Sequence, residues 1–112
     1  MNANADPTLI DGAQPYPTRC VLYPDGHKIN RFAKIPRADI EAIICDPHPD
    51  VPRELTTVNL RDGHVMLIHD LGHPFLLPIN PGATAAYHAT CVPGTTHEIR
   101  GVAVIVPDED FA

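Results

Sequence analysis

Histidine offers the most chemistry in this chain, because seven of the 112 residues are histidines. His64, His69 and His73 lie within ten positions of one another, and Asp70 directly follows the second of them. Imidazole nitrogens and carboxylates are common ligands of zinc and other transition metals. If these four groups faced one cavity, they would form a metal site, in either a metal-binding protein or a small metal-dependent hydrolase.

The spacing of these residues argues against a shared ion. Val65 to Ile68 is a run of strand formers, and successive side chains of a strand point to opposite faces of the sheet. His64 and His69 are five positions apart and should therefore face away from each other. In addition, His27, His64 and His73 each follow a glycine, which is typical of hairpin corners. We interpret these three as surface turn residues and keep the metal site as the alternative.

Other familiar catalytic groups are missing or isolated. The sequence contains no serine and neither of the glycine-rich phosphate-binding patterns, GxGxxG and GxxxxGK[ST]. Cys20, Cys45 and Cys91 are widely spaced and odd in number, which predicts buried free thiols in a reducing compartment. We therefore assign no catalytic residue, no metal ligand and no cofactor, and the sequence favours a protein that is not an enzyme.

Composition indicates a soluble globular protein, with 44% hydrophobic and 20% charged residues. No run approaches the ~20 apolar residues of a membrane span, and the first residues lack the basic start and apolar centre of a secretory signal. We expect a cytoplasmic protein that has no membrane partner. The net charge of −6 disfavours nucleic acid, which binds basic surfaces, and fits a protein partner.

The elements that position these groups follow from the prolines and the hydrophobic pattern. Strand formers on both sides of a Pro-Asp-Gly-His turn predict a hairpin over residues 19–32. Isoleucines at helical spacing, with a proline in the first turn, predict a helix over Ile35 to Cys45. Three prolines in the next eight residues predict an extended surface loop over Asp46 to Arg53.

The second half of the chain predicts more strands and one more helix. Glu54 to Leu60 and Val65 to Ile68 flank an Asp-Gly turn and form a hairpin, in which the second strand is apolar on both faces and therefore central. A short strand follows at Phe75 to Leu77. The last strand, His97 to Val106, contains a glycine that indicates a bulge or a close backbone approach.

The second helix is predicted between Asn80 and Thr90. Asn80 is a favourable N-cap, and Pro81 suits the first helical position because its missing N–H would have no partner there. The first turn of a helix exposes backbone N–H groups that can hold an anion. Asn80 and Thr84 are therefore candidates for binding a small ligand such as a nucleotide.

Together these elements predict an α+β fold in the order β-β-α-β-β-β-α-β. We expect one compact domain over residues 18–107, with a mixed or antiparallel sheet of about five to six strands and two short helices on one side. Residues 1–17 would form a flexible arm and residues 108–112 an acidic, solvated tail. Two strands that are apolar on both faces present more apolar surface than two short helices can easily cover. We therefore predict a homodimer in which the partner covers the second face of the sheet; in the alternative, loops and the N-terminal arm cover it.

Two motifs of the second half resemble a known group of proteins. The run LLPINPGATAAY at Leu76 to Tyr87 and the strand EIRGVAVIV at Glu98 to Val106 are similar to a family of short uncharacterised proteins of bacteriophages and actinobacterial mobile elements. The family pattern is a Leu-Pro-x-Asn-x-x-Ala-Thr helix start followed by an I-x-G-x-hydrophobic strand. This resemblance supplies no catalytic residue and implies a small accessory protein that acts in the host cytoplasm.

The predicted function is a non-enzymatic accessory protein that binds a host or competitor macromolecule as an inhibitor or modulator. A histidine-rich metal-binding protein or metal-dependent hydrolase is the first alternative, and a small-ligand or nucleotide-binding module is the second. The candidate binding residues are His64, His69, Asp70, His73, Asn80 and Thr84.

Overall fold

The computed structural model describes residues 19–61 and 63–111, which form one sheet with a helix on each face. The elements are β1 (Arg19–Leu22), β2 (Lys28–Arg31), α1 (Arg37–Cys45), β3 (Leu55–Asn59), β4 (His64–His69), α2 (Pro81–Thr90), β5 (Ala103–Pro107) and the 3₁₀ helix η1 (Asp108–Phe111). This is the predicted α+β class. The predicted arm over residues 1–17 lies outside the described residues.

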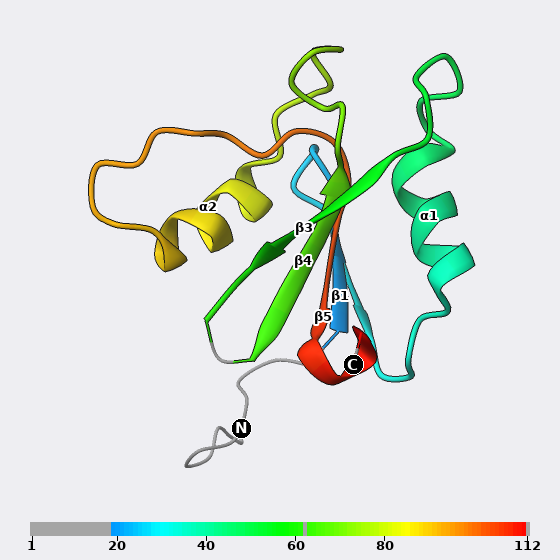
Figure 1. The fold of residues 1–112 in the computed structure, drawn as a ribbon, viewed down its shortest axis with the longest axis horizontal. Coiled ribbons are helices and arrows are strands. Elements are labelled where there is room, and N and C mark those ends of the chain that lie inside the picture. Colours follow the sequence, from blue (N-terminus) through cyan, green and yellow to red (C-terminus); the bar gives the residue numbers. More distant parts are fainter. Residues whose placement is uncertain (1–18, 62, 112) are drawn as a thin grey trace.

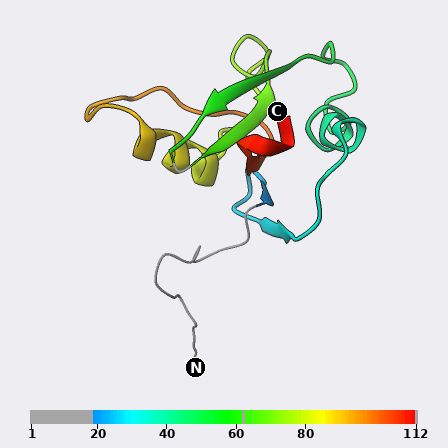
Figure 2. The same cartoon turned by 60° about the horizontal axis from the view of Figure 1, so that its bottom comes forward.

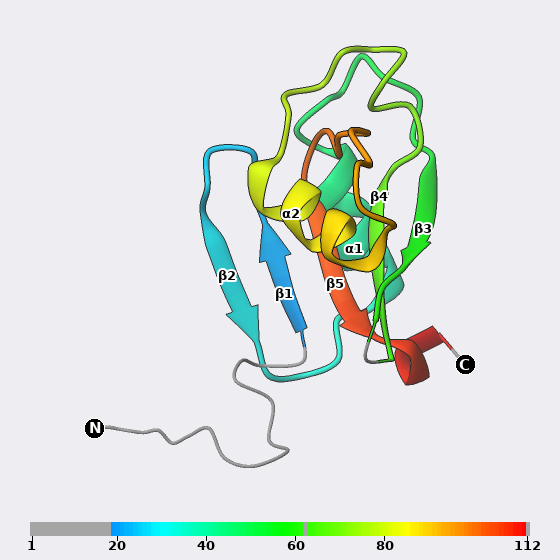
Figure 3. The ribbon, with the colours of Figure 1, turned by 90° about the vertical axis from the view of Figure 1, so that its left-hand side faces the viewer.

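Two hairpins and a C-terminal strand build the sheet. The β1–β2 and β3–β4 hairpins turn at Gly26 and Gly63, whose φ angles of 95° and 72° are accessible to glycine at little cost. β5 then enters between β1 and β4 and pairs antiparallel with both. The resulting strand order is β2-β1-β5-β4-β3, and every pairing is antiparallel (Figure 3).

The two helices lie on opposite faces of the sheet, so the prediction that both cover one side was wrong (Figures 1 and 2). Alternation along the central strands explains this arrangement, because each strand supplies apolar side chains to two cores. On the α1 face, Val65 and Leu67 of β4 pack in one cluster with Ile40 and Ile44 of the helix. On the other face, Met66 packs in a second cluster near α2.

Helix α2 has the predicted limits, and α1 begins two residues later than predicted. The Asn80 side chain caps α2 by accepting a hydrogen bond from the backbone N–H of Ala83, and Pro81 occupies the first helical position. Pro36 lies at the N-cap of α1, so its missing N–H leaves the first turn of that helix intact.

The chain after β4 differs from the prediction in two places. No strand forms over Phe75 to Leu77, where residues 71–76 make consecutive turns, and the last strand begins at Ala103 instead of His97. Gly101 does mark a close backbone approach, since its φ is 85° and an added Cβ would lie 3.2 Å from Cδ1 of Leu77. The positive φ at this glycine redirects the chain before β5, which shortens the strand.

The acidic C-terminal residues are not simply a solvated tail. They form η1, in which Asp110 accepts two hydrogen bonds from the Arg19 guanidinium, at 2.8 and 3.0 Å. This bidentate pair joins the last element of the chain to the first strand. Among the described residues, no helix is long and apolar enough to cross a membrane.

Candidate functional site

Strand β4 separates the histidines that were considered as metal ligands. His64 begins the strand on the α2 face, whereas His69 ends it on the α1 face, as strand alternation predicted. Five residues of strand place their backbones roughly 16 Å apart. Within the described ranges, no group of three or more histidine, cysteine, aspartate or glutamate side chains is arranged to hold a metal ion.

His64 is buried, which contradicts its interpretation as a surface turn residue. The turn ends one residue earlier, at Gly63, and His64 already pairs with Pro107 of β5. Because the strand begins at this residue, its side chain lies against the sheet instead of pointing to solvent. His27, in contrast, is an exposed turn residue, whose backbone N–H donates to the Asp25 carboxylate at 2.8 Å.

His69 is held in the neutral state by its surroundings. Its side chain is nearly inaccessible, at 2% exposure, and its Nδ1 accepts a hydrogen bond from the backbone N–H of Leu71 at 3.1 Å. The proton of the neutral ring is therefore on Nε2, which has no hydrogen-bond partner. Burial, and then the nearby His48, lowers the pKa of His69. This residue belongs to the core.

His73 and Asp70 lie at the start of the segment that joins β4 to α2. The Nε2 of His73 donates to the carbonyl oxygen of Glu98 at 2.6 Å, and its ring stacks on that of His97 with centroids 4.4 Å apart. Asp70 is exposed, and its backbone N–H donates to the carbonyl oxygen of Glu54. Both residues therefore attach this connecting segment to neighbouring parts of the fold.

Asn80 and Thr84 use their polar atoms within the protein. The Asn80 amide donates to the carbonyl oxygens of Leu22 and Gly101, both at 2.9 Å, in addition to capping α2. The Thr84 hydroxyl oxygen accepts from the backbone N–H of Ile99 at 2.9 Å. Neither side chain is directed to a ligand in this arrangement, and both attach the start of α2 to the segment that precedes β5.

The segment between β4 and α2 contains an unusual backbone conformation at Leu76. The N–H of Leu77 donates to the carbonyl oxygen of Gly72 at 2.9 Å. The N–H of Leu76 donates to the backbone carbonyl oxygen of His73 at 3.1 Å. This pair of bonds is the Schellman motif, in which the residue after the helical turn adopts a left-handed conformation. Leu76 occupies that position with a φ of 53°, where glycine is the usual residue.

The loop that carries Leu76 is fixed to the residues before β5. The Arg100 guanidinium donates to the carbonyl oxygen of Leu77 at 2.9 Å. The backbone N–H of Gly101 donates to the carbonyl oxygen of Pro78 at 2.7 Å. Pro74 and Pro78 further restrict the backbone. The loop therefore has few conformations to lose when another molecule binds to it.

Three large apolar side chains of this loop are exposed to solvent, and we call them the loop patch. They are Phe75, Leu76 and Ile79, with exposed fractions of 48%, 75% and 41%. The loop rises beyond the end of the sheet, at the top of Figure 1. No local pattern of the sequence indicates this patch, because an apolar run between two prolines is also typical of a short buried strand and position 76 is neither glycine nor asparagine.

Comparison with models of known protein families, with curated proteins and with solved structures finds no match for this chain. The resemblance to short phage proteins therefore stays a prediction.

Proposed function

We propose that this chain is a small, non-enzymatic accessory protein that binds another protein through the loop patch, Phe75, Leu76 and Ile79. The phage-type resemblance favours a host or competitor protein as the target, which the chain would inhibit or modulate in the cytoplasm. The observation that carries the proposal is the exposed, left-handed Leu76.

The left-handed conformation of Leu76 costs free energy that contacts within the protein do not offset. A left-handed conformation costs a residue with a Cβ about 1 kcal/mol relative to glycine. A side chain that is 75% exposed buries little apolar surface in return. Burial of the Leu76 side chain by a partner would offset this conformational cost. Backbone strain of this kind is often found at functional sites.

The partner that fits this surface is a protein with an apolar pocket and a basic rim. A leucine flanked by two other large apolar groups supplies the apolar centre that protein interfaces bury. The net charge of −6 would attract a basic surface from a distance and speed its association. The two loop prolines lower the conformational entropy that binding must remove.

Leu76→Gly and Leu76→Asn test this function, because both residues tolerate a left-handed backbone and remove the apolar side chain. We expect Leu76→Gly to raise the free energy of unfolding by about 1 kcal/mol in urea titrations. We also expect both variants to bind at least about tenfold more weakly to a partner that wild-type protein captures from host lysate, as measured by calorimetry with the purified partner.

Val92→Asn is the matched control, since Val92 is a branched apolar residue with nearly the same exposure, 76% against 75% for Leu76, in a different loop. It should bind the partner as the wild-type chain does. Equal binding by wild-type protein, Leu76→Asn and Val92→Asn would exclude the loop patch as the interface. Self-association that depends on Leu76 in sedimentation experiments would instead identify the partner as a second copy of this chain.

A further inference from the structure

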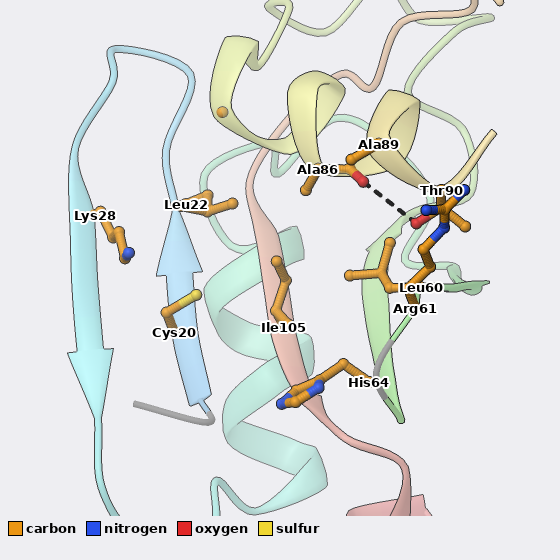
Figure 4. A pocket seen from close by; sticks show the side chains of 11 residues that line it. Cys20, Leu22, Lys28, Leu60, Arg61, His64, Ala86, Ala89, Thr90 and Ile105 are labelled. Carbon is orange, nitrogen blue, oxygen red and sulfur yellow. Dashed lines mark hydrogen bonds between the residues drawn. The ribbon is translucent and has the colours of Figure 1, made fainter. Parts of the chain in front are cut away.

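A cavity of about 610 Å³ lies between α2 and the sheet, on the face opposite α1. Its floor consists of Cys20 and Leu22 of β1 and Ile105 of β5, and Figure 4 shows these side chains below the helix. The volume is within the range of small-molecule sites, about 300–1,000 Å³. The cavity shares no residue with the loop patch.

Small residues on the helix leave this space open. Gly82, Ala86 and Ala89 are the α2 residues that line the cavity together with Thr90. Larger apolar residues at these positions would fill the gap above the sheet. The cavity lies beside a buried core cluster that includes Met66 and Ala83.

The charged residues that line the cavity among the described residues, Lys28 and Arg61, are both basic. Lys28 of β2 and Arg61 lie on opposite sides of it, and the His64 ring lies at its lower end (Figure 4). Within residues 19–61 and 63–111, no carboxylate lines the cavity, although the whole chain has 14 acidic and only eight basic side chains. The charge of the described lining residues is therefore opposite in sign to that of the molecule as a whole.

We propose that this cavity binds a small amphipathic anion, with an apolar acyl or aromatic body and a carboxylate, sulfonate or phosphate head. The apolar body would rest on Leu22 and Ile105, where its burial is favourable. The anionic head would be attracted by Lys28 and Arg61 at the edge, in a cleft whose low-dielectric walls strengthen that attraction.

The test uses the fluorescent dye anilinonaphthalene sulfonate, which has this chemistry, and phenylnaphthylamine, which has a similar apolar body without the charge. The wild-type chain should bind one anionic dye molecule per protein. Lys28→Glu/Arg61→Glu should lower the affinity for the anionic dye at least about tenfold and leave binding of the neutral dye nearly unchanged.

The matched control is Arg31→Glu/Lys34→Glu, which alters the net charge equally at exposed positions outside the cavity. It should change the affinity for the anionic dye less than about twofold. Equal losses in the two double variants would contradict the proposal, because net charge alone would then explain them.

A filling variant locates the bound dye. Ala86→Phe should weaken binding of both dyes, and Ala89→Trp, at an exposed helix position, gives the same readout if the first variant reduces the melting temperature. If folded filling variants bind the anionic dye as the wild-type chain does, the dye is bound elsewhere and the cavity is not its site.

Discussion

At the residue scale, burial decides the role of the histidines more than their number does. His69 shows this most clearly, since it follows four apolar residues in β4 and is itself buried, with one ring nitrogen bonded to the backbone N–H of Leu71. Its pKa lies below the ordinary value of 6.5 because burial penalises the charged ring. A residue that resembled a metal ligand in the sequence therefore serves the core in its neutral form.

The lowered pKa of His69 predicts acid sensitivity of the fold. Below pH ~6.5 the unfolded chain binds a proton that the folded chain does not bind, so the free energy of unfolding falls as the pH is lowered toward the folded-state pKa. His69→Gln should reduce this slope in urea titrations between pH 7.5 and 5, a range chosen around ~6.5. Equal slopes in the wild-type protein and in His69→Gln would contradict the prediction.

At the scale of elements, one side chain attaches α2 to the sheet. Asn80 bonds to the backbones of β1, of its own helix and of Gly101, the residue two positions before β5. The helix is amphipathic only to a small degree and contains several alanines, so little apolar surface holds it in place. The buried amide therefore fixes the position of α2 and, with it, the height of the cavity beneath the helix.

Asn80→Asp tests this attachment with a nearly isosteric change. The carboxylate keeps the cap acceptor, loses both donors and faces two carbonyl oxygens, so the free energy of unfolding should fall by about 3 kcal/mol. Asn30→Asp makes the same change on the exposed strand β2 and should cost less than about 0.5 kcal/mol. Chemical denaturation of both proteins measures the difference, and similar costs would show that the network contributes little.

At the scale of the whole molecule, the C-terminal part of the chain closes the fold. β5 lies between the two hairpins, and η1 then returns to the start of β1 through the Arg19–Asp110 pair. The guanidinium lowers the pKa of the Asp110 carboxyl by donating two hydrogen bonds to it. The two ends of the described domain are thus joined by a charge-assisted contact.

Asp110→Asn should lower the melting temperature at neutral pH. The contribution of this carboxylate is present above its ordinary pKa of 3.8 and is lost as the pH falls through the lower folded-state pKa, so the difference from wild type should disappear in strong acid. Asp108→Asn removes the same charge from an exposed position of η1 and should melt close to the wild-type temperature. A difference between Asp110→Asn and wild type that persists in strong acid would contradict this cause.

Local patterns predicted most of the elements. The glycine turns, the Asn80–Pro81 helix start and the isoleucine spacing of α1 depend on residues close together in sequence, and the structure confirms the fold class they indicated. Alternation along β4 also correctly separated His64 from His69, because strand geometry is the same in every sheet. These features are matters of backbone conformation and short-range hydrogen bonding.

The candidate sites depended on contacts between distant parts of the chain. The loop that carries Leu76 is fixed by hydrogen bonds with residues 98–101, and the cavity combines residues from both hairpins, α2 and β5. No local pattern specifies which face of the sheet a helix covers or how much of that face remains uncovered. The sequence by itself thus determined the class of fold and the caps and turns within it. Tertiary packing decided that His64 and His69 are buried, that Leu76 is exposed, and that a cavity with basic residues lies beneath α2.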